Sequence, residues 1–303
     1  MTDDLADLFP GFDSHWIDIG MGRLFARTGG AGPPLVLLHG FPQTHVMWHQ
    51  IAPRLAERFT LVVPDLRGYG WSSVPPGAED GSGFSKRLMA GDIVEAMEKL
   101  GHVRFAIAGH DRGGRVAYRL ALDHPGRVTA IAVLDIVPTT TVWDGFDRKA
   151  ALRTYHWPFL AQRAPLPETL IGGNPTFFLD WTLASWTASG SLEPFDPRAL
   201  AHYRAAFNNP DRIAAACGDY RAGASIDVDD DTADLAAGKK ISAPLLALWG
   251  SSGFPDAGDP LAAWRGFATQ VSAASVRSGH FVAEENPDGV SEALVPFLAG
   301  GRA

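Results

Sequence analysis

The stretch from Phe105 to Arg115 constrains the fold of this chain more than any other segment. Residues 105–108 are apolar and predict a short buried strand, and a helical pattern of apolar residues begins after Gly113 and Gly114. A strand that turns sharply into a helix, with small residues two positions before and two after one polar residue, is typical of a nucleophile elbow. The polar residue here is Asp111 rather than serine. The elbow therefore predicts a carboxylate nucleophile that attacks a saturated or strained carbon.

Composition restricts the class of protein. The 303 residues are 46% hydrophobic, which allows one large core, or a core with a smaller appended domain. The formal net charge of −8 argues against a nucleic-acid-binding surface, which needs a basic stripe. Cys217 is the single cysteine, so the sequence excludes an intrachain disulfide and a cysteine-based metal cluster. The acidic N-terminus lacks the apolar segment of a signal peptide, and no apolar stretch could span a bilayer, so we expect a cytoplasmic protein.

Apolar runs alternate with helical segments along much of the chain, and continuous apolar runs are typical of strands covered on both faces. After an opening hairpin over residues 16–27, the predicted strands are residues 34–39, 60–65, 105–108, 128–134, 244–250 and 274–277. The predicted helices lie at residues 49–59, 86–100, 116–124 and 288–298. This alternation predicts an α/β fold with a mostly parallel sheet and helices on both faces.

The alternation stops at Pro138. The chain from Thr139 to about Arg221 has no predicted strand, but helix-like segments rich in aromatic residues, separated by Pro and Gly. We therefore expect a helical cap over residues 139–225, inserted between the two parts of an α/β core, residues 1–138 and 226–303.

Three candidate catalytic side chains follow predicted strands, at the sheet edge where ligands bind in open α/β folds. Asp111 lies in the elbow, Asp135 follows the strand at 128–134, and His280 follows the last strand. We expect His280 to activate a water that hydrolyses the ester formed on Asp111, and Asp135 to orient His280. Asp256 and Asp259 are rival acids in a longer loop. We prefer Asp135 because it lies directly at a strand end.

The backbone amides of Phe41 and Arg112 are the expected oxyanion hole, one from each of two loops. They would stabilise the tetrahedral intermediate on the nucleophile's own carboxyl group rather than on the substrate. Plainer roles stay open, since the elbow and strand-end aspartates could each cap a helix or turn. We expect His39 and His110 to pack and hydrogen-bond beside the loops.

Two arginines, Arg112 and Arg115, follow the nucleophile at the start of the helix, three positions apart. The carboxylate of the nucleophile needs no such pair merely to stay ionised. An anionic substrate needs the pair in order to approach that carboxylate. Two like charges about 4 Å apart repel by about 4 kcal/mol at an effective dielectric near 20, a rate penalty on the order of a thousandfold. We expect the arginines to cancel this repulsion and to bind a carboxylate in bidentate fashion. A structural ion pair with Asp65 or Asp123 is the alternative.

The cap offers neutral hydrogen-bond donors in His156, Trp157 and Tyr220. Three donors that converge on a small pocket suit a departing halide, above all fluoride, which is compact and strongly hydrated. Trp157 and Tyr220 could equally belong to the apolar core of the cap, and so could Trp186, another aromatic candidate for the pocket lining. The adjacent histidine and the two arginines favour the halide site.

Taken together, these motifs resemble the fluoroacetate (haloacetate) dehalogenases of the α/β-hydrolase superfamily. The motifs that carry the resemblance are residues 110–115, Asp135, residues 155–157, Tyr220 and residues 278–280. Residues 39–44 and 65–72 are also shared with epoxide hydrolases and haloalkane dehalogenases, so they identify the superfamily only. Those two groups usually carry Trp after the nucleophile, where this chain has Arg112.

The resemblance implies an α/β-hydrolase fold with a mostly parallel eight-stranded sheet, a homodimer, and no metal or organic cofactor. It assigns site residues as follows: Asp111 as nucleophile, His280 as base, Asp135 as acid, Arg112 and Arg115 as carboxylate ligands, and His156, Trp157 and Tyr220 as halide ligands.

We therefore expect a hydrolytic dehalogenase that converts short 2-haloacids, fluoroacetate included, to 2-hydroxyacids. An epoxide hydrolase with the same three catalytic residues is the first alternative. It needs cap tyrosines, for which Tyr155 and Tyr220 are candidates, and Arg112 counts against it because a neutral epoxide gains nothing from a guanidinium. A non-catalytic binder of small acids is the second alternative, and the intact catalytic residues argue against it. No serine occupies the elbow, which excludes a serine esterase.

Overall fold

The computed structural model describes residues 5–20, 22–252 and 260–300. Its strands form one eight-stranded sheet in the order β1-β2-β4-β3-β5-β6-β7-β8. β1 pairs with β2 and β2 with β4 in antiparallel fashion, and every other neighbouring pair is parallel. The bounds are β1 Asp13–Ile19, β2 Gly22–Gly29, β3 Pro34–Leu38, β4 Thr60–Pro64, β5 Phe105–His110, β6 Val128–Leu134, β7 Leu245–Gly250 and β8 Val271–Val276. The predicted mostly parallel eight-stranded sheet is confirmed.

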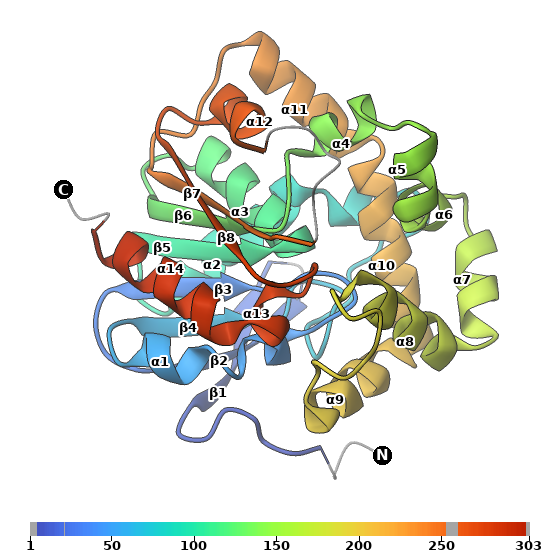
Figure 1. The fold of residues 1–303 in the computed structure, drawn as a ribbon, viewed down its shortest axis with the longest axis horizontal. Coiled ribbons are helices and arrows are strands. Elements are labelled where there is room, and N and C mark those ends of the chain that lie inside the picture. Colours follow the sequence, from blue (N-terminus) through green and yellow to red (C-terminus); the bar gives the residue numbers. More distant parts are fainter. Residues whose placement is uncertain (1–4, 21, 253–259, 301–303) are drawn as a thin grey trace.

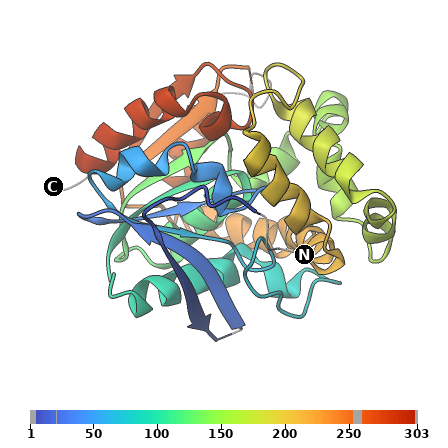
Figure 2. The ribbon, with the colours of Figure 1, turned by 90° about the horizontal axis from the view of Figure 1, so that it is seen from below.

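Helices cover both faces of this sheet. They are α1 (Ala52–Ala56), α2 (Lys86–Lys99), α3 (Asp111–Asp123), α12 (Pro260–Phe267), α13 (Val282–Glu285) and α14 (Pro287–Gly300). Figure 2 shows α1 and α14 on one side of the sheet and α2 on the other. α3 packs against α2, β5 and β6, so it lies on the α2 side. The result is the three-layer arrangement expected for a parallel sheet whose strands are apolar on both faces.

The chain between β6 and β7 consists of helices joined by loops. Its helices are α4 (Thr139–Asp144), α5 (Arg148–Arg153), α6 (His156–Leu160), α7 (Leu166–Gly172), α8 (Pro175–Trp186), α9 (Pro197–Phe207), α10 (Pro210–Gly223) and α11 (Ile226–Ala236). Figure 1 shows α5 to α10 as a lobe beside the sheet. We call residues 139–225 the cap, and α11 packs against α4 and α10. No helix within the described ranges is long and apolar enough to cross a membrane.

Several predicted elements have other bounds in the structure, and the helix expected from Val116, α3, already begins at Asp111. The helix expected over 49–59 is the short α1, and a 3-10 turn at His45–Trp48 precedes it. Pro53 lies in the first turn of α1, where its missing N–H costs nothing, and this favours a helix that begins there rather than earlier. The last strand begins at Val271 rather than Ala274, because β8 is an edge strand of mostly small residues, half of them exposed, with a weak apolar pattern.

The turn between β5 and α3 is possible because its neighbours are glycines. Asp111 has a φ of +47°, a left-handed conformation that costs energy for a residue with a side chain. A Cβ on Gly113 would lie 2.3 Å from the backbone oxygen of His39, and one on Gly109 would lie 2.4 Å from that of Gly113. The elbow and the loop after β3 therefore approach so closely that only glycine fits.

A buried carboxyl group joins the cap to the core. Oε1 of Glu284, in α13, accepts hydrogen bonds from the Tyr203 hydroxyl of α9 and, at 3.2 Å, from Nε2 of Gln43 in the loop after β3. All three side chains are buried. Burial is the largest influence on this group and raises the pKa of Glu284 to about 8. The neutral carboxyl group thus connects three segments that are far apart in the sequence.

The Gly113→Ala substitution should destabilise the protein by about 3 kcal/mol or more, because its Cβ would meet two backbone oxygens that cannot both move away. Gly91→Ala in α2 is the matched control, since a Cβ there meets nothing within 4 Å and should stabilise by about 0.4–1 kcal/mol. Urea denaturation of the two variants measures the difference. Equal stability would contradict the tight elbow.

The Glu284→Gln substitution should change how stability depends on pH. The folded pKa of about 8 lies above the ordinary 4.5, so the stability that Glu284 contributes is fully present below about pH 4.5 and is lost as the pH rises through about 8. Glutamine does not titrate. The free energy of unfolding of the variant, relative to the native protein, should therefore rise between about pH 5 and pH 8.5 in urea denaturation. The exposed Glu193→Gln is the control, and a difference that stays constant with pH would rule out a neutral Glu284.

Candidate active site

Asp111 lies at the carboxyl edge of the sheet, at the first position of α3. It is only 6% exposed, and its Oδ1 accepts a hydrogen bond of 2.8 Å from the backbone N–H of Phe41. Its Oδ2 lies 4.0 Å from Nε2 of His280. The recorded hydrogen bond of the carboxylate thus comes from the loop after β3, not from the α3 backbone as the capping role would require. Oδ2 is left facing His280.

The predicted acid and base are brought together. Nδ1 of His280 lies 2.6 Å from Oδ2 of Asp135, whose Oδ1 accepts a 3.0 Å hydrogen bond from the Gly250 N–H. A carboxylate accepts, so Nδ1 of His280 carries a proton and donates it to Asp135, while Nε2 faces Asp111. Asp135 has a φ of +52°; with Asp111, it is one of two non-glycine residues with positive φ in the described chain. The rival acids, Asp256 and Asp259, lie outside the described residues.

Charge tunes both reacting groups. Burial alone would raise the pKa of Asp111, but the charges of His280, His110, Arg112 and Arg115 outweigh it and hold the pKa below its usual value. Burial also disfavours the charged form of His280, and by itself it would lower the pKa of this side chain. The hydrogen bond to Asp135 and the charge of that carboxylate outweigh burial and raise the pKa of His280. Asp111 is therefore ionised at neutral pH, as a nucleophile must be.

The loop after β3 contributes the Phe41 amide, one of the two predicted oxyanion donors. Gly40 makes room for it, since a Cβ there would lie 2.4 Å from Cβ of Asp111. The other predicted donor, the Arg112 amide, lies in the first turn of α3, where backbone N–H groups have no partner within the helix.

His39 and His110 support the loops around the site, as their sequence positions indicate. His39 accepts a 3.0 Å hydrogen bond from the Leu66 N–H at Nε2, and its Nδ1 lies 3.1 Å from the oxygen of Gly40. Nε2 of His110 lies 2.8 Å from the backbone oxygen of His280, and the two rings are 4.6 Å apart. Each histidine thus lies within hydrogen-bonding distance of the backbone of a loop that carries a predicted site residue.

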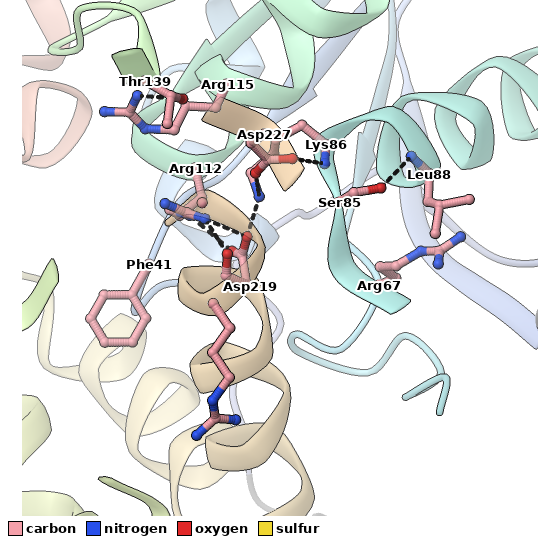
Figure 3. Close-up of polar contacts among 12 residues, drawn as sticks. Phe41, Arg67, Ser85, Lys86, Leu88, Arg112, Arg115, Thr139, Asp219 and Asp227 are labelled. Atoms are coloured by element: carbon pink, nitrogen blue, oxygen red, sulfur yellow. Dashed lines mark hydrogen bonds and ion pairs between the residues drawn. The ribbon is translucent and has the colours of Figure 1, made fainter. Parts of the chain in front are cut away.

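Arg112 is fully buried and paired with Asp219 of α10 (Figure 3). Its Nε donates to Oδ2 of Asp219 at 3.0 Å, and its Nη2 donates to Oδ1 at 2.6 Å. The alternative predicted an ion pair with Asp65 or Asp123. The predicted partner is wrong, because Arg112 pairs with Asp219. Asp65 is bound by His45 at 3.0 Å. Nη1 of Arg112 is buried without a hydrogen-bond partner in the described structure.

Arg115 is held by groups at the start of the cap. Its Nη1 donates to the backbone oxygen of Val137 and to Oγ1 of Thr139, both at 3.1 Å. Its Cζ lies 4.6 Å from the ring centre of Trp157. Both arginines thus already use part of their guanidinium groups in hydrogen bonds within the protein. Neither guanidinium is entirely free to bind a substrate carboxylate. Each arginine retains a buried nitrogen with no recorded partner, Nη1 of Arg112 and Nε of Arg115.

The three predicted halide ligands lie next to each other. The ring of Tyr220 is 5.6 Å from that of His156 and 6.0 Å from that of Trp157, and all three side chains are buried. Burial lowers the pKa of His156 to about 3 and raises that of Tyr220 well above its usual value, so both are neutral at pH 7. Nδ1 of His156 and the hydroxyl of Tyr220 are buried without a recorded partner. Buried polar atoms are seldom left unpaired, so these two atoms mark a polar binding position.

Trp186 connects this cluster to the predicted base. Its ring lies 4.2 Å from that of His156 and 5.4 Å from that of His280. Its backbone oxygen also accepts a 2.9 Å hydrogen bond from the His280 N–H. The structure therefore places Trp186, which was considered both for the pocket lining and for the cap core, beside the site.

Two residues of the site were missed by the sequence analysis. Asp219 pairs with Arg112 across more than a hundred residues, and its one signal is an acidic residue beside Tyr220 in an apolar, aromatic segment. Thr139, whose hydroxyl oxygen accepts a hydrogen bond from Arg115, was predicted only as the first residue of the cap. No group of three or more histidine, cysteine or acidic side chains suited to a metal ion occurs in the part of the chain that the structure describes.

Known proteins share this architecture. A family model described as alpha/beta hydrolase fold matches residues 33–287. The fluoroacetate dehalogenase of Burkholderia sp. is 42% identical over 98% of this chain and 97% of its own length. The soluble epoxide hydrolase of Corynebacterium sp. (strain C12) is 35% identical over 91% of this chain and 94% of its own. A solved structure from Nostoc sp. PCC 7120, described as that of an α/β hydrolase, has a TM-score of 0.91 and 48% identity, with 95% of this chain and 98% of that chain covered.

The family match spans most of the chain, and the two relatives cover nearly all of it. The sheet order and the strand–elbow–helix at Asp111 agree with it. The chain belongs to the α/β-hydrolase fold family and is a hydrolase.

Proposed function

We propose that this hydrolase removes the halogen from short 2-haloacids, fluoroacetate included, and releases a 2-hydroxyacid and a halide ion. In this proposal Asp111 is the nucleophile, His280 the base and Asp135 the acid that orients the base. Arg112 and Arg115 bind the substrate carboxylate, and His156, Trp157 and Tyr220 bind the halide.

The observation that carries the proposal is the pair of buried guanidinium groups beside a buried carboxylate nucleophile. Cζ of Arg112 lies 4.4 Å from the ring centre of Tyr220, and Cζ of Arg115 lies 4.6 Å from that of Trp157. Both cations thus adjoin the proposed halide ligands, and both lower the pKa of Asp111. A substrate with a carboxylate one bond from its carbon–halogen bond would place its two ends against these two sets of groups.

In the first step, Oδ2 of Asp111 attacks carbon 2 of the substrate in line with the carbon–halogen bond. Oδ1 is held by the Phe41 N–H, so Oδ2 is the oxygen available for attack. The new carbon–oxygen bond forms as the halide leaves with its bonding electron pair. Because attack and departure are in line, a chiral 2-haloacid would be inverted at carbon 2. Neutral donors around the halide stabilise its developing charge without a cation that would retain it.

In the second step, water attacks Cγ of the Asp111 ester. Nε2 of His280 takes the water proton, and Asp135 stabilises the imidazolium that forms. The oxyanion at Oδ1 is stabilised by the Phe41 and Arg112 amides. Collapse of the intermediate breaks the bond between Cγ and the ester oxygen, which takes the proton from Nε2 of His280, and the 2-hydroxyacid leaves. Asp111 then loses the remaining proton to solvent and is again a carboxylate. An oxygen atom of water remains on Asp111.

Epoxide hydrolysis is the second candidate, and the 35% identical epoxide hydrolase favours it. That reaction needs donors to the epoxide oxygen, and the buried hydroxyl of Tyr220 is one. Tyr155, the other candidate tyrosine, lines an apolar groove on the cap with Phe159 and Phe177. Two buried arginines have no role toward a neutral epoxide, so we rank this candidate second.

Purified enzyme should release fluoride from fluoroacetate and chloride from chloroacetate, as measured with ion-selective electrodes. Arg115→Leu should lower kcat/KM for chloroacetate about 10- to 100-fold, because a charge-assisted hydrogen bond to the carboxylate is lost. Styrene oxide, a neutral epoxide, is the control substrate. Faster turnover of styrene oxide than of either haloacid would favour the epoxide hydrolase instead.

The His280→Asn variant should accumulate the ester, because the first step needs no base and the second does. After incubation with chloroacetate, the peptide that contains Asp111 should gain the mass of a carboxymethyl group in mass spectrometry. The Asp111→Asn variant is the control and should gain nothing. An unmodified peptide from a His280→Asn variant that binds chloroacetate would indicate direct attack by water.

A further inference from the structure

The carboxylate of Asp219 is a meeting point of core and cap. It extends from α10 and accepts hydrogen bonds from Arg112 of α3, from Lys86 at the start of α2 and, at 2.7 Å, from the Tyr69 hydroxyl. Asp219 and Arg112 are both fully buried. Figure 3 shows the guanidinium of Arg112 turned toward Asp219, with Lys86 between Asp219 and Asp227. A buried carboxylate with two cationic partners and a phenol donor stays ionised, and its pKa is held well below the usual range despite burial.

Asp219 constrains Arg112 at three points. Nε and Nη2 bind its two carboxylate oxygens, and Nη2 also donates at 2.5 Å to its backbone oxygen. One turn further along α10, a Cβ on Gly223 would lie 2.8 Å from Nη2 and 3.1 Å from Nη1, so the missing side chain leaves space for the guanidinium. These contacts leave Nη1 as the one Arg112 nitrogen that is buried and has no recorded partner among the described residues.

We propose that Asp219 is a positioning residue for substrate binding: it holds Arg112 so that Nη1 donates to the substrate carboxylate. This inference rests on the proposed function. Asp219 also keeps Arg112 from turning to the adjacent nucleophile, since a guanidinium without a carboxylate partner would be drawn to the buried Asp111. A direct ion pair there would occupy the nucleophile and remove the donor that the substrate needs.

A purely structural role, the docking of the cap, is the competing explanation, and Asp227 provides the control. Asp227 is also buried in this cluster, and its Oδ2 lies 3.3 Å from Nζ of the same Lys86. The recorded hydrogen bonds and ion pairs of Asp227 include none to Arg112 in the described structure. Asp219→Asn and Asp227→Asn thus each remove one carboxylate partner of Lys86. Only Asp219→Asn also removes the carboxylate partner of Arg112.

The test measures binding of chloroacetate by isothermal titration calorimetry in an Asp111→Asn background, where an amide replaces the nucleophile. Adding Asp219→Asn should raise the dissociation constant about tenfold or more, because Arg112 loses its fixed orientation. Adding Asp227→Asn should change it less than about twofold. When Arg112→Gln is also present in the Asp111→Asn background, the Asp219→Asn change should have little further effect, since residues that act through one another are not additive.

Three results would overturn the proposal: an unchanged dissociation constant in the Asp219→Asn variant, an equal loss in both asparagine variants, or an undiminished effect of Asp219→Asn in the Arg112→Gln background. A crystal structure of Asp219→Asn provides a readout that needs no ligand. Arg112 should leave its position against Gly223, and an unmoved guanidinium would also refute the inference. If wild-type enzyme releases no halide while Arg112 moves in that structure, the proposed function fails and the positioning of Arg112 by Asp219 stands.

Discussion

The burial of opposite charges side by side is the constraint on which this site depends. A carboxylate or guanidinium removed from water costs several kcal/mol unless its partners compensate. Asp111 is compensated by the Phe41 amide and by the charges of His280 and the two arginines. Arg112 is compensated in turn by Asp219 from the cap. The nucleophile's ionisation and the packing of the cap on the core therefore support each other, because the cap provides the anion that allows the cation beside the nucleophile to stay buried.

Core and cap contribute different chemistry to this arrangement. The core provides the strained elbow, the base with its acid partner, and the cationic side chains. The cap provides an anion in Asp219 and neutral donors in His156 and Tyr220. Burial lowers the pKa of His156 and raises that of Tyr220, so both side chains stay uncharged. In the proposed reaction this division is useful, because a cation holds the carboxylate throughout the reaction while neutral groups assist a halide that must leave.

The predictions that succeeded rest on local signals. The glycines of the elbow and the continuous apolar runs of β3, β4 and β6 each act over a few residues. The catalytic roles of Asp111, Asp135 and His280 stay predictions. The pairing of Arg112 with Asp219 was missed because it joins α3 to α10, and the position of Asp219 beside Tyr220 is its one local difference from a surface acid. Glu284 was missed for the same reason, since its neutral state arises from burial among segments that are far apart in the sequence. The edge strand β8 was misplaced because exposed residues carry little apolar pattern.

Overall likeness does not separate a dehalogenase from an epoxide hydrolase, because relatives of both kinds cover nearly the whole chain. The elbow and the histidine with its acid partner serve either reaction, so the difference must lie in groups that contact the rest of the substrate. A tryptophan in place of Arg112 would leave Asp219 with Lys86 and Tyr69 but without the guanidinium that binds both of its oxygens. Arg112 and Asp219 are thus a physical unit: a change to one leaves a buried charge without its partner. The presence of both together is a sharper criterion for an anionic substrate than either residue alone.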